Sequence, residues 1–280
     1  MSYIVTSEWV SKHLEERDND LVMVDCRFEL QSPDVGKRLY IDNHLPTAVY
    51  LDLNKDLSGP TQQHGGNHPL PDMHEFAEKL GNLGIDEKTT VVVYDQANEM
   101  YAPRLWWLLT YMGHEDVYVL DGGYEKWVAE GRTVTQEIVT RTPKVFTPHI
   151  QENEKVDMDE VKEKLSNQSA ILIDSRAKNR YLGKVEPMYS KAGHIPGAKN
   201  YFFKGVLKDN GLWKNTQEIE AHFADLPKDQ EIIVSCGSGV SACPNIIALK
   251  QAGFTNVKLY PGSYSDWISY EENNVETKEE

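Results

Sequence analysis

The chain has 280 residues and a net charge of −15, and it is 40% hydrophobic and 26% charged. This length predicts two domains with apolar cores. The negative charge argues against non-specific binding of nucleic acid, because two polyanions repel each other. No apolar run approaches the roughly 20 residues of a membrane span. The N-terminal "MSYIVTSEWVSKHL" lacks the basic and apolar segments of a signal peptide.

The chain contains three cysteines, Cys26, Cys236 and Cys243. Their odd number and irregular spacing do not indicate a disulfide framework, and they fit a reducing compartment. The sequence contains no CxxC pair and no histidine cluster at ligand spacing, so it predicts no zinc site. We therefore expect a cytoplasmic monomer that binds no metal, no nucleic acid and no membrane.

The first predicted element is a helix over residues 7–16, with Ser7 as its N-cap. Apolar, β-branched runs then alternate with helical stretches, which is typical of a parallel sheet covered by helices. The blocks of the first half are, in order, "LVMVDCR" (21–27), "NHLPTAVYLDL" (43–53), "TVVVYDQ" (90–96) and "GHEDVYVLDGGYEKW" (113–127).

The same blocks return in the same order in the second half of the chain. A helix predicted over residues 157–168, with Asp157 as its N-cap, precedes them. They are "AILIDSR" (170–176), "GHIPGAKNYFF" (193–203), "EIIVSCG" (231–237) and "GFTNVKLYPGSYSDW" (253–267). Four matched blocks indicate a duplicated α/β domain. We predict domains over residues 1–139 and 156–280, joined by a proline-containing linker over residues 140–155.

The two halves differ at one position that can carry chemistry. Asp95 stands in the first half where Cys236 stands in the second, so we expect one chemical site and a catalytically silent first domain. The first half is also longer before its third block. The extra length lies around "SGPTQQHGGNHPLP" (58–71), which carries His64 and His68. Long loops on a rigid scaffold often serve a site.

Cys236 follows an apolar strand and precedes the loop "GSGVSA" and a predicted helix. Two glycines permit backbone conformations in which the amides of residues 237–241 turn inward around the sulfur. Inward amides at a helix N-terminus form an anion site, and such a site favours the reactive thiolate of a cysteine. The alternative is that Cys236 is a small buried apolar residue. Core packing is the favoured interpretation of Cys243 and Cys26.

Two reaction classes use a cysteine at the mouth of a loop of backbone amides. Cysteine phosphatases require an arginine at the sixth position after the cysteine, and that position is Ala242 here. Without this cation, phosphate loses its main electrostatic partner. The second class takes up a sulfur atom as a persulfide and passes it on, and a ring of amides and hydroxyls suits that intermediate.

At these residues the chain resembles the rhodanese family. Over residues 2–267 it is similar to the two-domain members, the thiosulfate and 3-mercaptopyruvate sulfurtransferases, and the motifs that carry the resemblance are "DSRAKNRYLG", "GHIPGA", "CGSGVSA" and "GSYSDW". The resemblance implies tandem α/β domains, each with a mostly parallel five-stranded sheet flanked by helices. It also implies a silent first domain, an active second domain, and no cofactor, because a cysteine persulfide carries the sulfur.

The resemblance assigns the candidate site residues. Cys236 would be the nucleophile, within a six-residue cradle over residues 236–241. The substrate-binding positions would be Arg176, Arg180, Gly237, Gly239, Val240 and Ser241. Arginine forks suit a carboxylate or sulfonate donor; the alternative for both arginines is a surface or interdomain ion pair.

A serine, a histidine and an acid have been proposed to move the proton in mercaptopyruvate enzymes. Ser238 and His68 match the first two, while an exposed loop position is the alternative for His68. Asn54 stands at the place of the acid, with Asp52 and Asp56 nearby, so the sequence leaves open which of them completes the arrangement. His44 and His194 lie in the repeated HxP turn and are expected to be structural.

Gly237 and Ser238 follow the pattern of the mercaptopyruvate members, whereas thiosulfate-preferring members carry basic residues after the cysteine. Fewer cations weaken binding of a dianion more than that of a monoanion. We therefore expect an enzyme that moves sulfur from 3-mercaptopyruvate, a small anionic donor, through a Cys236 persulfide to a thiol, cyanide or thioredoxin-like acceptor. The alternatives are a thiosulfate sulfurtransferase and a non-catalytic rhodanese-like binding module.

Overall fold

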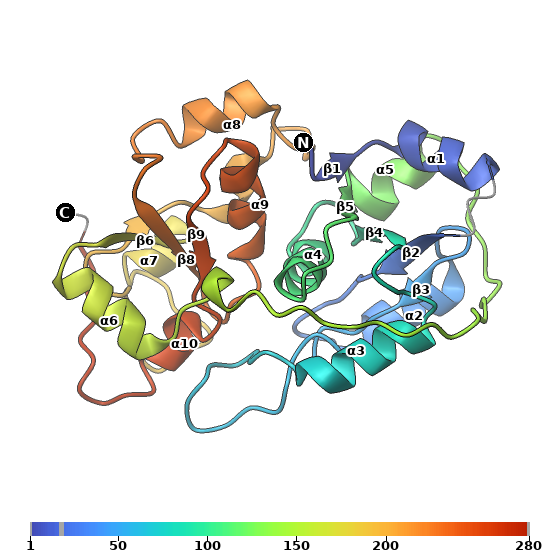
Figure 1. Cartoon of the computed structure of the whole chain (residues 1–280). Helices are drawn as coiled ribbons and strands as arrows, with labels where there is room; N and C mark the ends of the chain where they lie inside the picture. The colour runs from blue at the N-terminus through green and yellow to red at the C-terminus, as the bar shows by residue number, and fades with distance from the viewer. Residues whose placement is uncertain (1, 17–19, 279–280) are drawn as a thin grey trace. The chain divides into compact units, whose positions relative to one another are not determined.

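The computed structural model describes residues 2–16 and 20–278 (Figure 1). The chain divides into two compact units. Unit 1 comprises Met1–Gly59, Leu70–Gln151 and Asp209–Trp213, and unit 2 comprises Pro60–Pro69, Glu152–Lys208 and Lys214–Glu280. The loop that carries His64 and His68 therefore belongs to the unit formed mainly by the second half of the sequence.

Unit 1 contains a parallel five-stranded sheet in the order β1-β5-β4-β2-β3. Its strands are β1 (Ile4–Val5), β2 (Leu21–Asp25), β3 (Val49–Tyr50), β4 (Thr90–Tyr94) and β5 (Val117–Leu120). The two central strands, β2 and β4, are apolar and almost wholly buried, as expected where helices cover both faces of a sheet. Asp25 pairs with Tyr94, so the segments that follow these two strands leave the sheet at the same edge.

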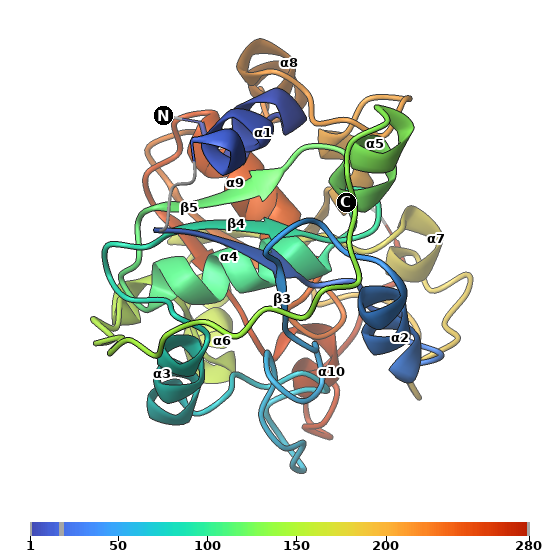
Figure 2. The same ribbon diagram turned by 90° about the vertical axis from the view of Figure 1, so that its right-hand side faces the viewer.

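The helices of unit 1 are α1 (Ser7–Glu15), α2 (Asp34–Asp42), α3 (Met73–Asn82), α4 (Tyr101–Tyr111) and α5 (Gly123–Ala129). Figure 2 shows α1 and α5 over one face of the sheet and α4 over the other. On the first face, Val10 of α1, Tyr40 of α2 and Trp127 of α5 join one buried cluster with strand residues Met23 and Val92. Alternate side chains of each strand thus supply the two cores.

Unit 2 repeats this sheet with one strand fewer, in the order β7-β6-β8-β9. Its strands are β6 (Ala170–Asp174), β7 (Lys199–Asn200), β8 (Glu231–Ser235) and β9 (Val257–Leu259), and all pairs are parallel. The place that β1 takes in unit 1 is held by an isolated bridge between Lys155 and Leu259. The chain is extended there only between the short helix η1 (Glu152–Glu154) and the N-cap Asp157, which is too short for a strand.

The helices of unit 2 are α6 (Met158–Ser166), α7 (Lys178–Tyr181), α8 (Thr216–His222), α9 (Cys243–Gln251) and α10 (Ser263–Trp267), with a 3-10 turn, η2 (Phe203–Val206). Val161 of α6, Tyr181 of α7 and Trp267 of α10 pack against one face of the sheet, and α9 contacts β8 and β9 (Figure 1). The predicted tandem of α/β domains is confirmed, with sheets of five and four strands. Within the described part of the chain, no helix has the length and apolar character needed to cross a membrane.

The helix N-caps show how closely local sequence signals locate the elements. Asp157 caps α6 as predicted, in a capping box with Glu160. The predicted cap Ser7 is wrong by one residue, because Thr6 caps α1 with its hydroxyl and Ser7 is already helical. Adjacent Thr and Ser are both good caps, so their sequence alone does not separate them.

Candidate active site

Cys236 is the first residue after β8, at the edge where the parallel strands end. Its side chain is only 1% exposed. The N–H of Gly239 points at the sulfur, with a distance of 3.1 Å between nitrogen and Sγ. The thiol therefore lies in the turn that follows the strand, where a backbone N–H donates to the sulfur. The sequence predicts such inward-pointing amides for this loop.

Helix α10 holds the backbone of this loop from behind. The Cys236 N–H donates to Ser263 Oγ at 3.0 Å, and the amides of Tyr264 and Ser265 donate to the carbonyls of Cys236 and Gly237. Ser263 is wholly buried and has a φ of +53°, a conformation that residues other than glycine adopt rarely. Its twin in the first half is Gly123, with a φ of +56°. The second half therefore accepts a strained serine at the point where its hydroxyl meets the cysteine.

The cradle over residues 236–241 turns sharply at Gly239. Its φ is +76°, and a Cβ there would lie 2.3 Å from the carbonyl oxygen of Pro261, so only glycine fits. Ser238 and Val240 are buried and Ser241 is half-buried. Cys243 is buried at the start of α9, and its thiol contacts the Gly239 carbonyl at 3.5 Å. Cys243 therefore supports the cradle from the helix and does not face it as a second nucleophile.

The corresponding loop of unit 1 encloses the carboxyl group of one of its own residues, Asp95. Asp95 is 1% exposed, and its carboxylate accepts the amides of Glu99, Tyr101 and Ala102 at 3.0–3.2 Å. Burial raises the pKa of Asp95, while these three amides act in the opposite direction. The duplicated loop is thus able to surround a negatively charged group with backbone N–H donors.

Residues 60–69 bring His68 to the cradle within unit 2. His68 Nδ1 lies 2.7 Å from Ser238 Oγ. Three further bonds hold the same loop on α10 and the residues after it: His64 to the Ser269 hydroxyl, the Gly65 amide to the Asp266 carboxylate, and the Asn67 amide to the Ser265 hydroxyl. The predicted pair of Ser238 and His68 is therefore in direct contact, and His64 anchors the loop.

The three residues considered for an acid beside His68 lie in unit 1. The Asp52 carboxylate accepts the amides of Asn54 and Lys55. Asp56 accepts the Asp52 amide at 2.7 Å and pairs with Lys79. These bonds form a closed turn within unit 1, and which of the three residues serves as the acid stays a prediction.

Arg176 is buried among bonds within unit 2. It is 2% exposed, donates to both carboxylate oxygens of Asp174 and to the Gly193 carbonyl, and lies 3.9 Å over the Tyr264 ring. Arg27, its twin in unit 1, makes the corresponding contacts with Asp25, the Asn43 carbonyl and the Tyr124 ring. The half without a cysteine keeps these contacts, while, among the described residues, Arg176 alone of the two also contacts a glutamate, Glu186. The predicted contact of Arg176 with a donor stays a prediction.

Arg180 is the more exposed of the two arginines, and its Nε and Nη2 donate to both carboxylate oxygens of Glu186. Its side chain is 21% exposed, and it pairs with the buried Glu186 at 2.9 Å. Its guanidinium also lies 5.3 Å from the centre of the Tyr189 ring. Glu186 contacts Arg176 as well, so one carboxylate orients both arginines and leaves Arg180 at the surface of the site.

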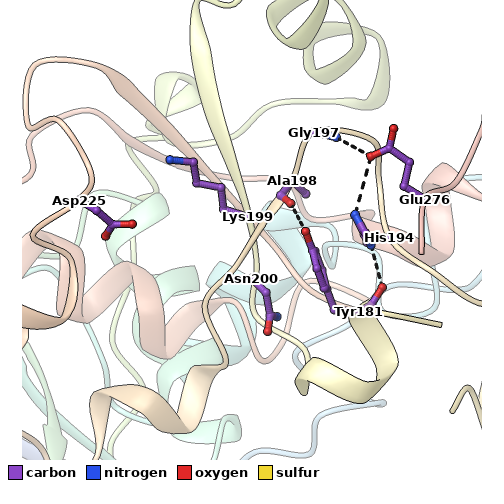
Figure 3. Close-up of a pocket in the computed structure, with 8 residues that line it drawn as sticks. All are labelled: Tyr181, His194, Gly197, Ala198, Lys199, Asn200, Asp225 and Glu276. Carbon is purple, nitrogen blue, oxygen red and sulfur yellow. Dashed lines mark hydrogen bonds and ion pairs between the residues drawn. The ribbon is translucent and has the colours of Figure 1, made fainter. Parts of the chain in front are cut away.

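The remaining predicted structural residues make bonds within the fold. Cys26 is buried directly after β2, and burial raises the pKa of its thiol. His44 and His194 each contact the carbonyl of a tyrosine at 2.7 Å, Tyr40 and Tyr181. His194 lines a cavity of about 390 Å³, stacks on the Tyr181 ring and lies 3.8 Å from the Glu276 carboxylate. Figure 3 shows His194 in contact with both Tyr181 and Glu276. Its ring is engaged in holding this turn to the C-terminal segment.

Sequence reasoning missed three residues around the cysteine: Ser263, Glu186 and Tyr189. Ser263 could have been found, since it replaces Gly123 in the repeat while its neighbours match. Glu186 and Tyr189 lie between α7 and β7, in a segment that the matched blocks of the repeat do not cover. No repeat could therefore draw attention to them.

A buried cysteine at the end of a parallel strand, facing loop amides in one of two duplicated α/β units, defines the class of proteins that hold a sulfur or phosphorus anion on a thiol. The rhodanese-like domain family matches residues 6–130 and 157–270. The chain therefore belongs to the rhodanese family, as a two-domain sulfurtransferase.

The names of individual relatives specify two different sulfur donors. The chain is 38% identical to a probable 3-mercaptopyruvate sulfurtransferase from Pseudomonas aeruginosa, over 95% of each chain. It is 33% identical to the thiosulfate sulfurtransferase of Cricetulus griseus, over 95% of this chain and 91% of the relative. Its structure matches that of SseA from Escherichia coli, described as a 3-mercaptopyruvate sulfotransferase, with a TM-score of 0.84, 31% identity, and coverage of 95% and 100%.

Proposed function

We propose that this sulfurtransferase takes sulfur from 3-mercaptopyruvate, holds it as a persulfide on Cys236, and passes it to a thiol, cyanide or a thioredoxin-like protein. The observation that carries the proposal is the 2.7 Å contact between His68 and Ser238, two residues after the nucleophile. The sulfur of 3-mercaptopyruvate carries a proton that must leave it, whereas the outer sulfur of thiosulfate carries none at neutral pH. A hydroxyl and imidazole pair beside the thiolate serves the first donor.

In the first half-reaction, the Cys236 thiolate attacks the sulfur of the donor. A lone pair of the thiolate forms the S–S bond, the C–S bond breaks, and its electron pair remains on the carbon as the enolate of pyruvate. The donor's thiol proton moves through Ser238 and His68 and ends on that carbon. The products are the Cys236 persulfide and pyruvate.

In the second half-reaction, an acceptor thiolate or cyanide attacks the outer sulfur of the persulfide. The S–S bond breaks, and its electron pair returns to Cys236 as the thiolate. The acceptor leaves as a persulfide or as thiocyanate. The two half-reactions together involve no net gain or loss of electrons, so the proposed mechanism uses no redox cofactor.

The charge of the site supports a monoanionic donor. Residues 237–241 contain no basic side chain, and Arg180 is the arginine beside the cradle that reaches the surface. A single guanidinium matches one carboxylate in a bidentate pair. A dianion such as thiosulfate would lose more from the absence of a second cation.

Thiosulfate is the second candidate donor, because a thiosulfate sulfurtransferase is 33% identical to this chain over 95% of its length. A binding module without catalysis is the other alternative. It predicts that the purified protein carries no sulfur that cyanide can release, which a colorimetric thiocyanate assay measures directly.

Steady-state turnover of the purified protein with each donor, at a fixed cyanide concentration, tests the proposal. We expect 3-mercaptopyruvate to exceed thiosulfate in kcat/KM by at least about tenfold, which corresponds to about 1.4 kcal/mol. A higher kcat/KM with thiosulfate would leave the nucleophile in place and reject the proposed donor.

A further inference from the structure

Tyr189 lies against the catalytic loop from a segment that the repeat does not contain. It follows Glu186 in the connection between α7 and β7, and its side chain is half-buried. The ring meets Tyr264 of α10 edge-on, with 5.8 Å between centroids. These contacts fix the ring, so the position of the hydroxyl is set by the fold.

The Tyr189 hydroxyl reaches the residue next to the nucleophile. A Cβ on Gly237 would lie 2.6 Å from Tyr189 Oη, which is closer than such atoms approach each other. The missing side chain of Gly237 is therefore the space into which this hydroxyl projects. Gly237 and Tyr189 form a matched pair, in which the glycine admits the tyrosine.

The Tyr189 ring also lies near the half-buried Arg180. The Arg180 guanidinium lies 5.3 Å from the centre of the Tyr189 ring. Burial and then the charge of a Cys236 thiolate raise the pKa of Tyr189, with Arg180 opposing them. The phenol therefore keeps its proton at neutral pH and is a neutral hydrogen-bond donor beside a cation.

We propose that Tyr189 is a second donor-binding residue, whose hydroxyl donates a hydrogen bond to the ketone oxygen of 3-mercaptopyruvate while Arg180 binds its carboxylate. The inference rests on the proposed function, since it names the residue that recognises the keto acid. When the C–S bond breaks, negative charge develops on this oxygen as the enolate forms. A fixed donor aimed at that oxygen stabilises the transition state more than the ground state. Sulfur transfer from thiosulfate forms no enolate and should use the hydroxyl little.

Tyr189→Phe tests the role of the hydroxyl and keeps the ring. Its kcat/KM is measured with 3-mercaptopyruvate and with thiosulfate, beside wild type and Tyr118→Phe, a half-buried tyrosine of β5 in unit 1. Loss of one oxyanion donor reduces kcat by about a hundredfold or more in other enzymes. We expect at least a tenfold loss, mainly in kcat, with 3-mercaptopyruvate, and less than about a threefold change with thiosulfate.

Two results would overturn the assignment: equal losses with both donors, which would place the hydroxyl in support of the loop, or no loss with either. The proposed function fails separately, in the wild-type arm, if that protein prefers thiosulfate.

A double-mutant cycle with Gly237→Ala gives an independent readout. The added methyl group should displace the hydroxyl and reduce kcat/KM with 3-mercaptopyruvate by about tenfold in wild type. In the Tyr189→Phe background the clashing oxygen is absent, so Gly237→Ala should change kcat/KM by less than about threefold. Full additivity of the two substitutions would contradict the matched pair. Thermal melting of each variant checks that the fold is retained.

Discussion

The loops after β4 and β8 occupy equivalent positions in the duplicated units, and they differ in the side chain that each encloses. In unit 1 the loop surrounds the carboxylate of Asp95, a permanent part of the fold, with three amides. In unit 2 the amide of Gly239 meets the sulfur of Cys236. In each half, backbone N–H groups of the loop meet a side chain that can carry negative charge. In unit 1 that side chain is a carboxylate, and in unit 2 it is the cysteine that we propose as the carrier of sulfur.

The side chains around the two loops are partly shared between the units and partly specific to unit 2. Arg27 and Arg176 make equivalent buried bonds with Asp25 and Asp174 in the two units. His68, Arg180 and Tyr189 gather only around the second loop. Unit 2 therefore differs from unit 1 in this set of neighbours as well as in the cysteine.

The largest expected effect comes from replacing the nucleophile. Cys236→Ser should reduce turnover by at least about a thousandfold, or about 4 kcal/mol, because a serine hydroxyl is not ionised at neutral pH and cannot hold a persulfide. Cys26→Ser is the matched control, since its twin in the repeat is already Ser175. Release of thiocyanate from cyanide measures both, and full turnover by Cys236→Ser would reject the mechanism.

Removal of the pair beside the nucleophile should come next. We expect His68→Ala and Ser238→Ala each to reduce kcat with 3-mercaptopyruvate by about a hundredfold, because the donor's thiol proton loses its path. Thiosulfate carries no such proton, so its turnover should change much less. The double variant should be little worse than either single one, because the two residues act as a unit. Equal losses with both donors would indicate a structural role for the contact.

The arginines test the division between scaffold and site. Arg180→Gln should raise KM for 3-mercaptopyruvate by about tenfold or more, through loss of a bidentate carboxylate contact. Arg176→Gln and Arg27→Gln should instead each lower the free energy of unfolding by about 3 kcal/mol, because each leaves a buried carboxylate unpaired. Urea unfolding and steady-state kinetics separate the two outcomes. A KM effect of Arg176→Gln in a fully stable protein would restore its predicted role as a substrate ligand.

The smallest expected effect concerns the silent loop and depends on pH. Burial raises the pKa of Asp95 in the folded protein, so the folded state binds this proton more tightly than the unfolded chain. Its contribution to stability is fully present below the ordinary pKa of aspartate and is lost as pH rises through the raised value. Wild type should therefore lose stability relative to Asp95→Asn across this window, and the difference should be constant above it. Thermal melting between acidic and neutral pH measures this, and a difference that changes in the opposite direction would contradict it.

Much of the fold and the centre of the site follow from the repeat. Matched apolar blocks predict the parallel strands, and the replacement of Asp95 by Cys236 locates the chemistry, because strand ends and the loops after them are local features. The fifth strand of unit 2 was not distinguishable from a single bridge at Lys155, since both are extended chain. The HxP histidines could be expected to be structural because both halves carry them.

The parts that sequence could not provide depend on long-range contacts. The bond between His68 and Ser238 joins positions 170 residues apart, and only the folded chain brings them together. Arg176 and Arg180 are four residues apart in one motif, and their different burial separates them. Tyr189 reaches Gly237 from an irregular connection that has no period and no twin.

Mass spectrometry tests directly whether sulfur is carried by the second loop alone. The protein is mixed with excess 3-mercaptopyruvate in the absence of an acceptor, and intact-protein and peptide mass spectrometry locate the added mass. We predict one added sulfur atom per chain, on the peptide that contains Cys236, and its loss on addition of cyanide. Sulfur on Cys26 or Cys243, or a protein that turns over while Cys236 stays unmodified, would contradict it.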